Sequence, residues 1–350
     1  MIIGDHHISK NHKPFIVAEM SGNHNQSLER ALKIVEAAAK AGVQMLKLQT
    51  YTADTLTINV KSGDFFVGDP KSLWKGKSLY ELYKEAFTPW EWHEPIIKKA
   101  NELGMLCFST PFDETAVDFL EKLNVPAYKI ASFENTHLPL IKKVAKTGKP
   151  VIVSTGLATK TEIEETVQTL RSSGCNDFAL LKCTSAYPAS PENSNVLTIP
   201  DLRKNFNCEV GLSDHTMGIG AAIAAISHGA TIIEKHFTLD RNDGGVDSSF
   251  SIEPKELKIL VFESVRAWQA LGKVSYGPTD AEKESIKFRR SIYIVKDMKS
   301  GDILTKDNLR IIRPGRGLAA KYFDELIGCR VNRSIKKGTA ANWDLIEKKK

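Results

Sequence analysis

Short β-rich runs alternate with amphipathic, helix-like segments through most of the chain. Each run is apolar where it begins and polar where it ends. The eight runs cover residues 15–20, 45–50, 105–110, 127–132, 151–155, 179–184, 210–215 and 232–237. Eight β/α repeats predict a (β/α)8 TIM barrel, an α/β fold. The rival is a doubly wound sheet, but no G-x-G-x-x-G turn follows the first run.

One segment between the runs carries its own start and stop signals. Thr161 is followed three residues later by Glu164, which is the spacing of a capping box. Gly174 follows the amphipathic stretch and suits the end of a helix. We therefore expect a helix that begins at Thr161 and ends before Gly174.

Polar residues at the ends of the runs form three pairs, and the members of each pair stand two positions apart. The pairs are Lys47 with Gln49, Ser213 with His215, and Glu234 with His236. Strand periodicity places both members of a pair on one face, and the carboxyl ends of barrel strands form one rim, where catalytic residues collect. Because an unpaired buried charge is costly, the pattern predicts a shared polar cavity at that rim.

Two kinds of binding chemistry are available at this rim. His215 and His236 end adjacent strands, and two imidazoles there suit a labile divalent ion such as Mn²⁺ or Mg²⁺; a purely structural histidine is the alternative for each. A second group offers positive charge and hydroxyl donors for a dianionic phosphate, although loop capping explains any single serine. Its members are Thr110, Lys129, Ser132, Ser154 and Ser213.

Acids that can move protons or hold sugar hydroxyls fall at the same end of the runs. They are Glu19, Glu134, Asp214, Glu234 and Asp247. We expect Cys183 to be a small core residue rather than a nucleophile. The histidines outside the strand pattern are expected at the surface, namely His6, His7, His12 and His93.

Two stretches depart from the repeat. Residues 51–92 form a long insertion, rich in aromatic residues and glycine, which predicts a functional lid or a subunit contact. Residues 273–285 have the composition of a linker, and residues 286–350 show short strands and tight turns. We therefore predict a barrel domain over 1–272, a linker over 273–285 and a small, mostly β domain with a thin core over 286–350.

Composition describes the setting of the protein rather than its chemistry. The net charge of +6 fits either an anionic substrate or a solvated surface. The lysines are interleaved with acids, which does not favour nucleic acid. No apolar stretch suits a membrane span or a secretory signal. The five scattered cysteines suit reduced thiols, so we expect a cytoplasmic protein.

Long motifs in this chain resemble those of the sialic acid synthase family, from about residue 13 to residue 346. AEMSGNHNQS, KLQTYTADT, FSTPFDETAVDFL, YKIASFEN, VIVSTGLAT, LLKCTSAYP, GLSDHT and IEKHFT occur in the family's order. The C-terminal part resembles the family's antifreeze-like (SAF) domain, with the sequence RPG at 313–315. AEMSGNHN and LYKEAFTPWEWH are most like the pseudaminic acid synthases within the family.

That resemblance implies a reaction in which phosphoenolpyruvate condenses with 2,4-diacetamido-2,4,6-trideoxy-L-altrose. Synthases for N-acetylneuraminate and legionaminate are the near alternatives. A related condensing aldolase is a second interpretation, which the appended SAF domain disfavours. A third is a non-catalytic sugar-binding or ice-binding protein, which the polar strand ends disfavour.

The resemblance also implies roles for individual residues. His215 and His236 look like the metal ligands. Positions that grip phosphoenolpyruvate match Lys47, Thr110, Lys129, Ser132, Ser154, Ser185 and Ser213, with Ser185 where neuraminate synthases carry asparagine. Positions around the sugar and the reacting carbons match Glu19, Gln49, Glu134, Tyr187, Glu234, Asp247 and Phe288. Arg313 resembles the arginine that the SAF domain inserts into the other subunit's barrel, which implies a domain-swapped homodimer.

Overall fold

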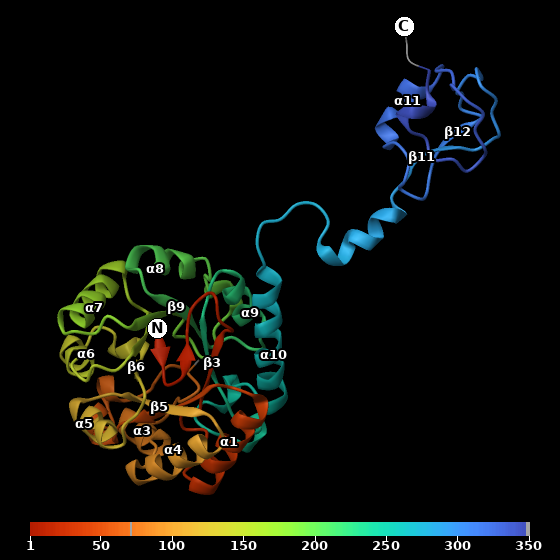
Figure 1. The fold of residues 1–350 in the computed structure, drawn as a ribbon. Helices are drawn as coiled ribbons and strands as arrows, with labels where there is room; N and C mark the ends of the chain where they lie inside the picture. The colour runs from red at the N-terminus through yellow and green to blue at the C-terminus, as the bar shows by residue number, and fades with distance from the viewer. Residues whose placement is uncertain (71, 348–350) are drawn as a thin grey trace. The chain divides into compact units, whose positions relative to one another are not determined.

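The computed structural model describes residues 1–70 and 72–347. The chain divides into two compact units, Met1–Gly272 and Lys273–Lys350 (Figure 1). The last residues of the predicted C-terminal domain, 348–350, lie outside the described residues.

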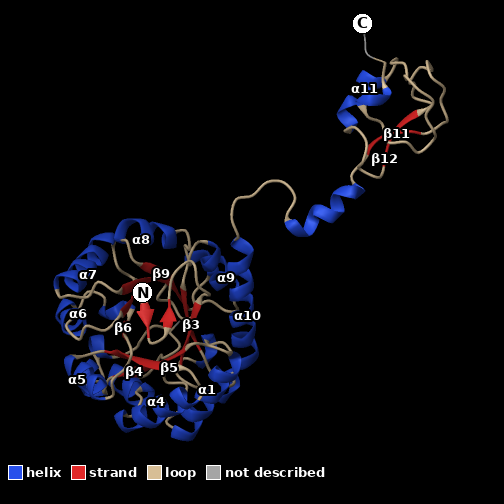
Figure 2. Cartoon of the chain, viewed as in Figure 1, coloured by secondary structure: helices blue, strands red, loops and turns tan. Residues whose placement is uncertain are grey.

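Eight parallel strands close into a barrel in the first unit (Figure 2). They are β3 (Phe15–Glu19), β4 (Met45–Thr50), β5 (Leu106–Pro111), β6 (Tyr128–Ile130), β7 (Val151–Ser154), β8 (Phe178–Cys183), β9 (Glu209–Asp214) and β10 (Ile232–His236). They pair in chain order, and β10 returns to pair with β3. Each strand falls on one of the predicted runs, so the predicted TIM barrel is confirmed and the open sheet is excluded.

Helices form a ring around the strands (Figure 2). They are α1 (Leu28–Ala41), α4 (His93–Glu102), α5 (Glu114–Lys122), α6 (Leu138–Ala145), α7 (Lys160–Ser172), α8 (Thr198–Phe206), α9 (Gly220–Ser227) and α10 (Pro254–Leu271), with α2 (Ala53–Leu56) and α3 (Leu79–Ala86) in the insertion. Short 3-10 turns are η1 (Gly63–Phe65), η2 (Trp90–Trp92), η3 (Ser132–Glu134), η4 (Pro191–Asn193), η5 (Arg241–Asp243) and η6 (Ser248–Phe250). None of the described helices has the length and apolar character needed to span a membrane.

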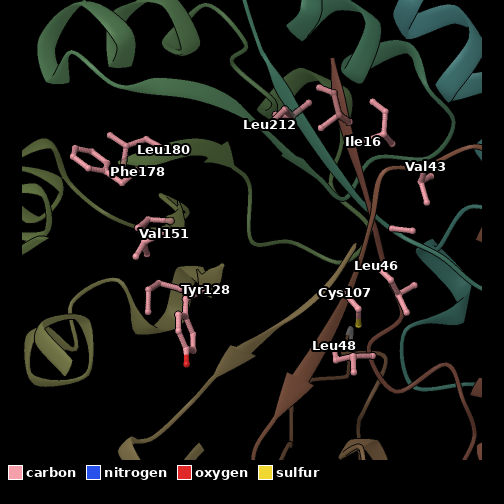
Figure 3. Packing of buried hydrophobic residues seen from close by; sticks show 14 of the residues in the cluster. Ile16, Val43, Leu46, Leu48, Cys107, Tyr128, Val151, Phe178, Leu180 and Leu212 are labelled. Carbon is pink, nitrogen blue, oxygen red and sulfur yellow. The ribbon is translucent and has the colours of Figure 1, made fainter. Parts of the chain in front are cut away.

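Side chains on the outer face of the barrel wall pack beneath the helices. Ile16, Leu46, Val151 and Leu212 belong to this cluster, which is the larger core of the unit (Figure 3). Because side chains alternate along a strand, the residues between them point into the barrel.

The inward side chains fill one half of the barrel with apolar residues. Phe15, Met45 and Phe108 pack there as a separate cluster, together with Ile3 from the N-terminal hairpin. That hairpin pairs β1 (Ile2–Ile3) with β2 (His6–His7). The inward positions that come later in each strand are polar, so the other end of the barrel interior is left for a polar site.

Helix α7 begins at Lys160, one residue earlier than predicted, and its N-cap lies two residues before Thr161. Its N-cap is Thr159, whose side chain accepts from the backbone of Glu162 in a full capping box. The predicted start at Thr161 is wrong because the sequence holds two overlapping T-x-x-E spacings, and Thr159 is the one with extended backbone, at φ −72° and ψ 163°. The predicted end is confirmed, since Gly174 follows the helix with a φ of 95°.

His93 is buried, so the prediction that it lies at the surface is wrong. Its side chain has no exposed area, and its Nε2 lies 2.8 Å from the hydroxyl of Thr50. The insertion carries His93 back against the barrel at the start of α4, a contact that local sequence does not reveal. The histidines of the N-terminal segment are at least partly exposed, as predicted: His6, His7 and His12.

The second unit is a small β module with its own core, as predicted. Strand β11 (Ser291–Ile294) pairs antiparallel with β12 (Leu309–Ile312), and single bridges join the remaining segments. Its helical pieces are η7 (Asp280–Phe288), η8 (Ala320–Tyr322), α11 (Phe323–Leu326) and η9 (Trp343–Leu345). Helix η7 begins within the segment predicted as a linker, where Thr279 and Glu282 form a capping box.

Candidate active site

The inward-facing polar residues meet in a cavity at the carboxyl ends of the barrel strands. Its volume is about 300 Å³. The predicted residues on its lining are Lys47, Gln49, Lys129, Ser132, Glu134, Ser154, Tyr187, Ser213, His215, Glu234, His236 and Asp247. The predicted shared polar cavity is present, and the three strand-end pairs supply six of these twelve residues.

Six predicted residues stand outside this lining. One is Asp214, predicted as a candidate acid of the site, which is instead buried in an ion pair with Lys235 at 2.8 Å. Glu19 and Thr110 are buried in the barrel wall, and Ser185 is half-buried on the loop after β8. Phe288 and Arg313 belong to the second unit, where both side chains are exposed.

Two lysines and two carboxylates form a buried network at the floor of the cavity. Lys47 Nζ lies 3.1 Å from Glu19 Oε2 and 3.1 Å from Glu234 Oε1. Lys129 Nζ lies 3.8 Å from the same Glu234 oxygen and donates to Ser154 Oγ at 2.6 Å. Two positive and two negative charges balance, which makes their burial tolerable.

The network gives its two carboxyl groups, Glu234 and Glu19, very different pKa values. Burial would raise the pKa of Glu234, but the ammonium groups of Lys129 and Lys47 outweigh it and lower that pKa to about 2. Burial raises the pKa of Glu19 to about 7, against the attraction of Lys47. Burial also lowers the pKa of Lys129 to about 8, while Glu234 opposes the change. Glu234 is thus a fixed counter-ion rather than a proton carrier.

Glu134 is the acid that both faces the cavity and titrates near neutrality. Burial raises its pKa to about 7, against the positive charges of Lys129 and Lys47. Its Oε2 atom finds no hydrogen-bond partner within residues 1–70 and 72–347. A carboxyl group with a free oxygen and a pKa near 7 is suited to proton transfer.

Hydroxyl groups from neighbouring loops converge beside Lys129. Ser132 Oγ accepts from the backbone N–H of Gly156 at 3.1 Å. A Cβ atom on Gly156 would stand 2.4 Å from Ser185 Oγ and 2.6 Å from Ser132 Oγ. The glycine therefore lets the loops after β6, β7 and β8 approach one another, which concentrates donors of the kind that hold phosphate.

The two strand-end histidines face each other across the rim and suit a metal ion. Their ring centroids are 5.2 Å apart. His215 Nδ1 lies 2.9 Å from the carbonyl oxygen of Thr184; because a carbonyl only accepts, Nδ1 carries the proton and Nε2 keeps its lone pair.

His236 offers a neutral imidazole to the same space. Burial lowers its pKa well below the usual value, and the ammonium groups of Lys47 and Lys129 act in the same direction. Its Nδ1 has no hydrogen-bond partner in the described part of the chain and lies 3.6 Å from Asp247 Oδ2. The described residues contain no cluster of three or more His, Cys, Asp or Glu ligands, so two imidazoles leave most coordination positions open for water or substrate.

Several residues of the cavity were missed or misjudged from the sequence. Cys183 is buried as predicted, but it also lines the cavity, with its Sγ 3.9 Å from His215 Nδ1. Ser21, just past the end of β3, donates to Asp247. The insertion contributes further lining residues, among them Tyr51, Trp74 and Tyr83. Its aromatic composition was the available signal, but composition does not say which side chains point inward.

Family models match both units. The NeuB family model covers residues 34–276, and the SAF domain model covers residues 289–347. This chain belongs to the NeuB family.

Named relatives align over nearly the whole chain. A pseudaminic acid synthase of Campylobacter jejuni is 43% identical over 97% of this chain and 98% of its own. An N,N'-diacetyllegionaminic acid synthase of the same species is 35% identical over 93% of this chain and 98% of its own. Among solved structures, an N-acetylneuraminic acid synthetase from Leptospira borgpetersenii in complex with citrate has a TM-score of 0.73 at 32% identity, covering 83% of this chain and 95% of its own.

Proposed function

We propose that the chain is a pseudaminic acid synthase, which condenses phosphoenolpyruvate with 2,4-diacetamido-2,4,6-trideoxy-L-altrose and releases phosphate. The observation that carries this proposal is the meeting of Lys129, the loop hydroxyls, Glu134 and the paired imidazoles in one cavity. The choice of sugar follows the higher identity to the pseudaminic acid synthase, 43% against 35% for the legionaminic acid enzyme.

Lys129 and the hydroxyls beside it would hold the phosphate group. The Lys129 ammonium already donates to Ser154 Oγ at 2.6 Å, and Ser213 Oγ donates to Glu234 Oε1 at 3.1 Å. Both hydroxyls can turn toward a phosphate oxygen while Glu234 keeps the lysines protonated. The carboxylate end of phosphoenolpyruvate would then lie toward Lys47, the other lysine of the described lining.

The reaction forms one carbon–carbon bond and breaks one carbon–oxygen bond. The enol carbon of phosphoenolpyruvate attacks the aldehyde of the open-chain sugar, and water adds to the neighbouring carbon. Collapse of that adduct releases phosphate and leaves the keto acid. One proton of the water ends on the new sugar hydroxyl and the other on phosphate. Glu134, with its pKa of about 7, is the group we assign to carry a proton between these sites.

A divalent cation, Mn²⁺ or Mg²⁺, is proposed at His215 and His236, where bound metal would polarise the aldehyde oxygen. Charge balance supports it. The lysines on the described part of the lining are Lys47 and Lys129, and both are already paired with Glu234. A trianionic substrate therefore needs additional positive charge.

The assembly and the compartment are proposals from the family resemblance. We propose a domain-swapped homodimer in which one chain supplies Arg313 to the barrel of the other, and a cytoplasmic location. The exposed position of Arg313 in its own unit is compatible with such a role. Mixing a Lys129→Ala chain with an Arg313→Ala chain tests the exchange, because only a mixed dimer contains one intact shared site.

The reaction itself is tested by phosphate release from phosphoenolpyruvate with each candidate sugar. We expect Mn²⁺-dependent release with 2,4-diacetamido-2,4,6-trideoxy-L-altrose, and at least about 10-fold lower kcat/KM with N-acetylmannosamine, since small pocket differences discriminate by that order. Preference for N-acetylmannosamine or for the legionaminic acid precursor would replace the proposed sugar. No release with any amino sugar would reject the synthase.

A further inference from the structure

The insertion after β4 builds one side of the cavity from apolar side chains. Leu56, Val67, Trp74, Leu79, Leu82 and Ala86 all lie on the lining, and we name this set the insertion wall. The lining also carries the lysines, serines and histidines of the strand ends. The cavity thus combines charged groups from the strand ends with hydrocarbon surface from the insertion.

Trp74 connects the insertion wall to the residues around Asp247 and His215. Its indole Nε1 donates to the backbone oxygen of Val246 at 2.9 Å, next to Asp247 in sequence. Its ring centroid lies 5.9 Å from that of Tyr187, which lies 4.5 Å from the ring of His215. The indole N–H is already satisfied, so the ring has no further donor to offer a ligand.

The character of this wall decides which substituents it accepts. A hydroxyl that leaves water for an aliphatic surface loses its hydrogen bonds unless a partner is provided. The hydroxyls of Tyr51 and Tyr83 stand on the same insertion, but the six members of the wall contribute no side-chain acceptor. A methyl group in the same place gains by burial.

We propose that the insertion wall recognises methyl groups of the amino sugar, namely a deoxy terminal carbon and the methyls of its acetamido groups. By the same contacts it selects against sugars with a hydroxymethyl or free hydroxyl there. This inference rests on the proposed function, because it assigns a specificity surface to the same site. Trp74 and Val67 are its specificity-determining residues.

The first experiment compares kcat/KM for the trideoxy diacetamido sugar with kcat/KM for N-acetylmannosamine, in the full-length chain with Mn²⁺. Trp74→Ala should reduce the preference for the methyl-bearing sugar about 10-fold or more. Val67→Thr has nearly the same shape but adds a hydroxyl, and should shift the ratio in the same direction. Leu73→Ala is the matched control, since Leu73 is 50% exposed beside Trp74 and off the lining.

A second measurement does not depend on turnover. Saturation-transfer NMR on the full chain with the non-reacting alditol of each sugar reports which ligand protons touch the protein. We expect the methyl protons of the trideoxy diacetamido alditol to receive the strongest transfer in the unmodified chain. That excess should fall at least about twofold in Trp74→Ala and persist in Leu73→Ala.

The outcomes separate the two proposals. Condensation with a sugar ratio that Trp74→Ala and Val67→Thr leave unchanged would overturn the insertion wall and leave the synthase standing. Methyl-selective saturation transfer without condensation would overturn the synthase and support the wall. Uniform transfer across the ligand, or none, would overturn the wall whatever the turnover.

Discussion

The strand-end floor of the cavity and the insertion wall are built on different principles. The floor stands on the barrel strands, and the exposed fractions of Glu19, Lys47, Lys129 and Glu234 are 0%, 4%, 1% and 3%. The wall stands on a loop and two short helices, and most of its members are only half-buried. Residues of the floor cannot be substituted without disturbing the packing of the barrel, whereas residues of the insertion wall can.

This difference suggests a division of labour. Groups that must be held in fixed geometry for bond making belong on rigid elements, and the floor provides them. Choice among similar sugars needs a surface that varies without loss of the fold, and loops tolerate such variation. Substitutions in the floor should therefore have large effects, and substitutions in the insertion small ones.

The largest effect is expected at the two histidines that we propose as metal ligands. Replacing His236 by alanine should lower turnover about a thousandfold, because Lewis-acid stabilisation contributes several kcal/mol. Thermal unfolding should change little, since His236 Nδ1 makes no hydrogen bond to the described residues. His228→Ala, at an exposed position outside the cavity, is the control. An active His236→Ala enzyme that ignores chelators would refute the metal assignment.

The largest effect on the free energy of unfolding is expected from breaking the buried ion pair between Lys235 and Asp214, which lies behind the floor. Lys235 Nζ donates to Asp214 Oδ2 at 2.8 Å and to the Thr216 carbonyl at 2.5 Å, on the outward side of β9 and β10. Lys235→Met leaves the buried Asp214 carboxylate uncompensated, so the free energy of unfolding should fall by about 3–5 kcal/mol.

The double variant Asp214→Leu with Lys235→Met removes both charges and should recover much of that loss in denaturant unfolding. If the single variant lost less than about 1 kcal/mol, the strands behind the site would not be held by this pair.

The sequence predicted the positions of residues in the regular β/α repeats. It did not predict distances between side chains or the structure of the irregular insertion. Period-two spacing placed Lys47 and Glu234 on inward faces, and the parallel barrel then brought them together. The spacing does not encode that their charged atoms lie 3.1 Å apart, because that depends on strand stagger and rotamers. The difference between the pKa of Glu134, about 7, and the pKa of Glu234, about 2, follows from this geometry. It could not be predicted from the sequence either.

The insertion shows the limit most clearly. Its composition predicted a functional loop, and Trp74 does line the cavity. The insertion has no regular alternation of apolar and polar residues. Its local sequence therefore does not indicate that Trp74 lines the cavity while the neighbouring Leu73 is exposed. His93 and the start of α7 were misplaced for related reasons: a long-range contact fixes the first, and two equivalent local signals compete at the second.

The pH dependence probes the floor with a smaller effect. Burial lowers the pKa of Lys129 to about 8, with opposing and supporting contributions from Glu234, Lys47, Cys183 and Glu19. If the cationic form of Lys129 binds phosphate as proposed, kcat/KM for phosphoenolpyruvate should fall about tenfold per pH unit above pH 8. Lys129→Arg should remove this alkaline limb, because guanidinium keeps its proton. A limb unchanged by that substitution would assign the titration to another group.

The smallest effect is expected on the insertion itself. Ile58 is 57% exposed and lies outside the cavity lining, so Ile58→Ala should change the free energy of unfolding by less than about 0.5 kcal/mol. The comparison with Lys235→Met is made in the same denaturant titration, followed by tryptophan fluorescence. A loss above about 2 kcal/mol would mean that the insertion unfolds cooperatively with the barrel. The wall would then be as constrained as the floor, and sugar choice could not vary there independently of the fold.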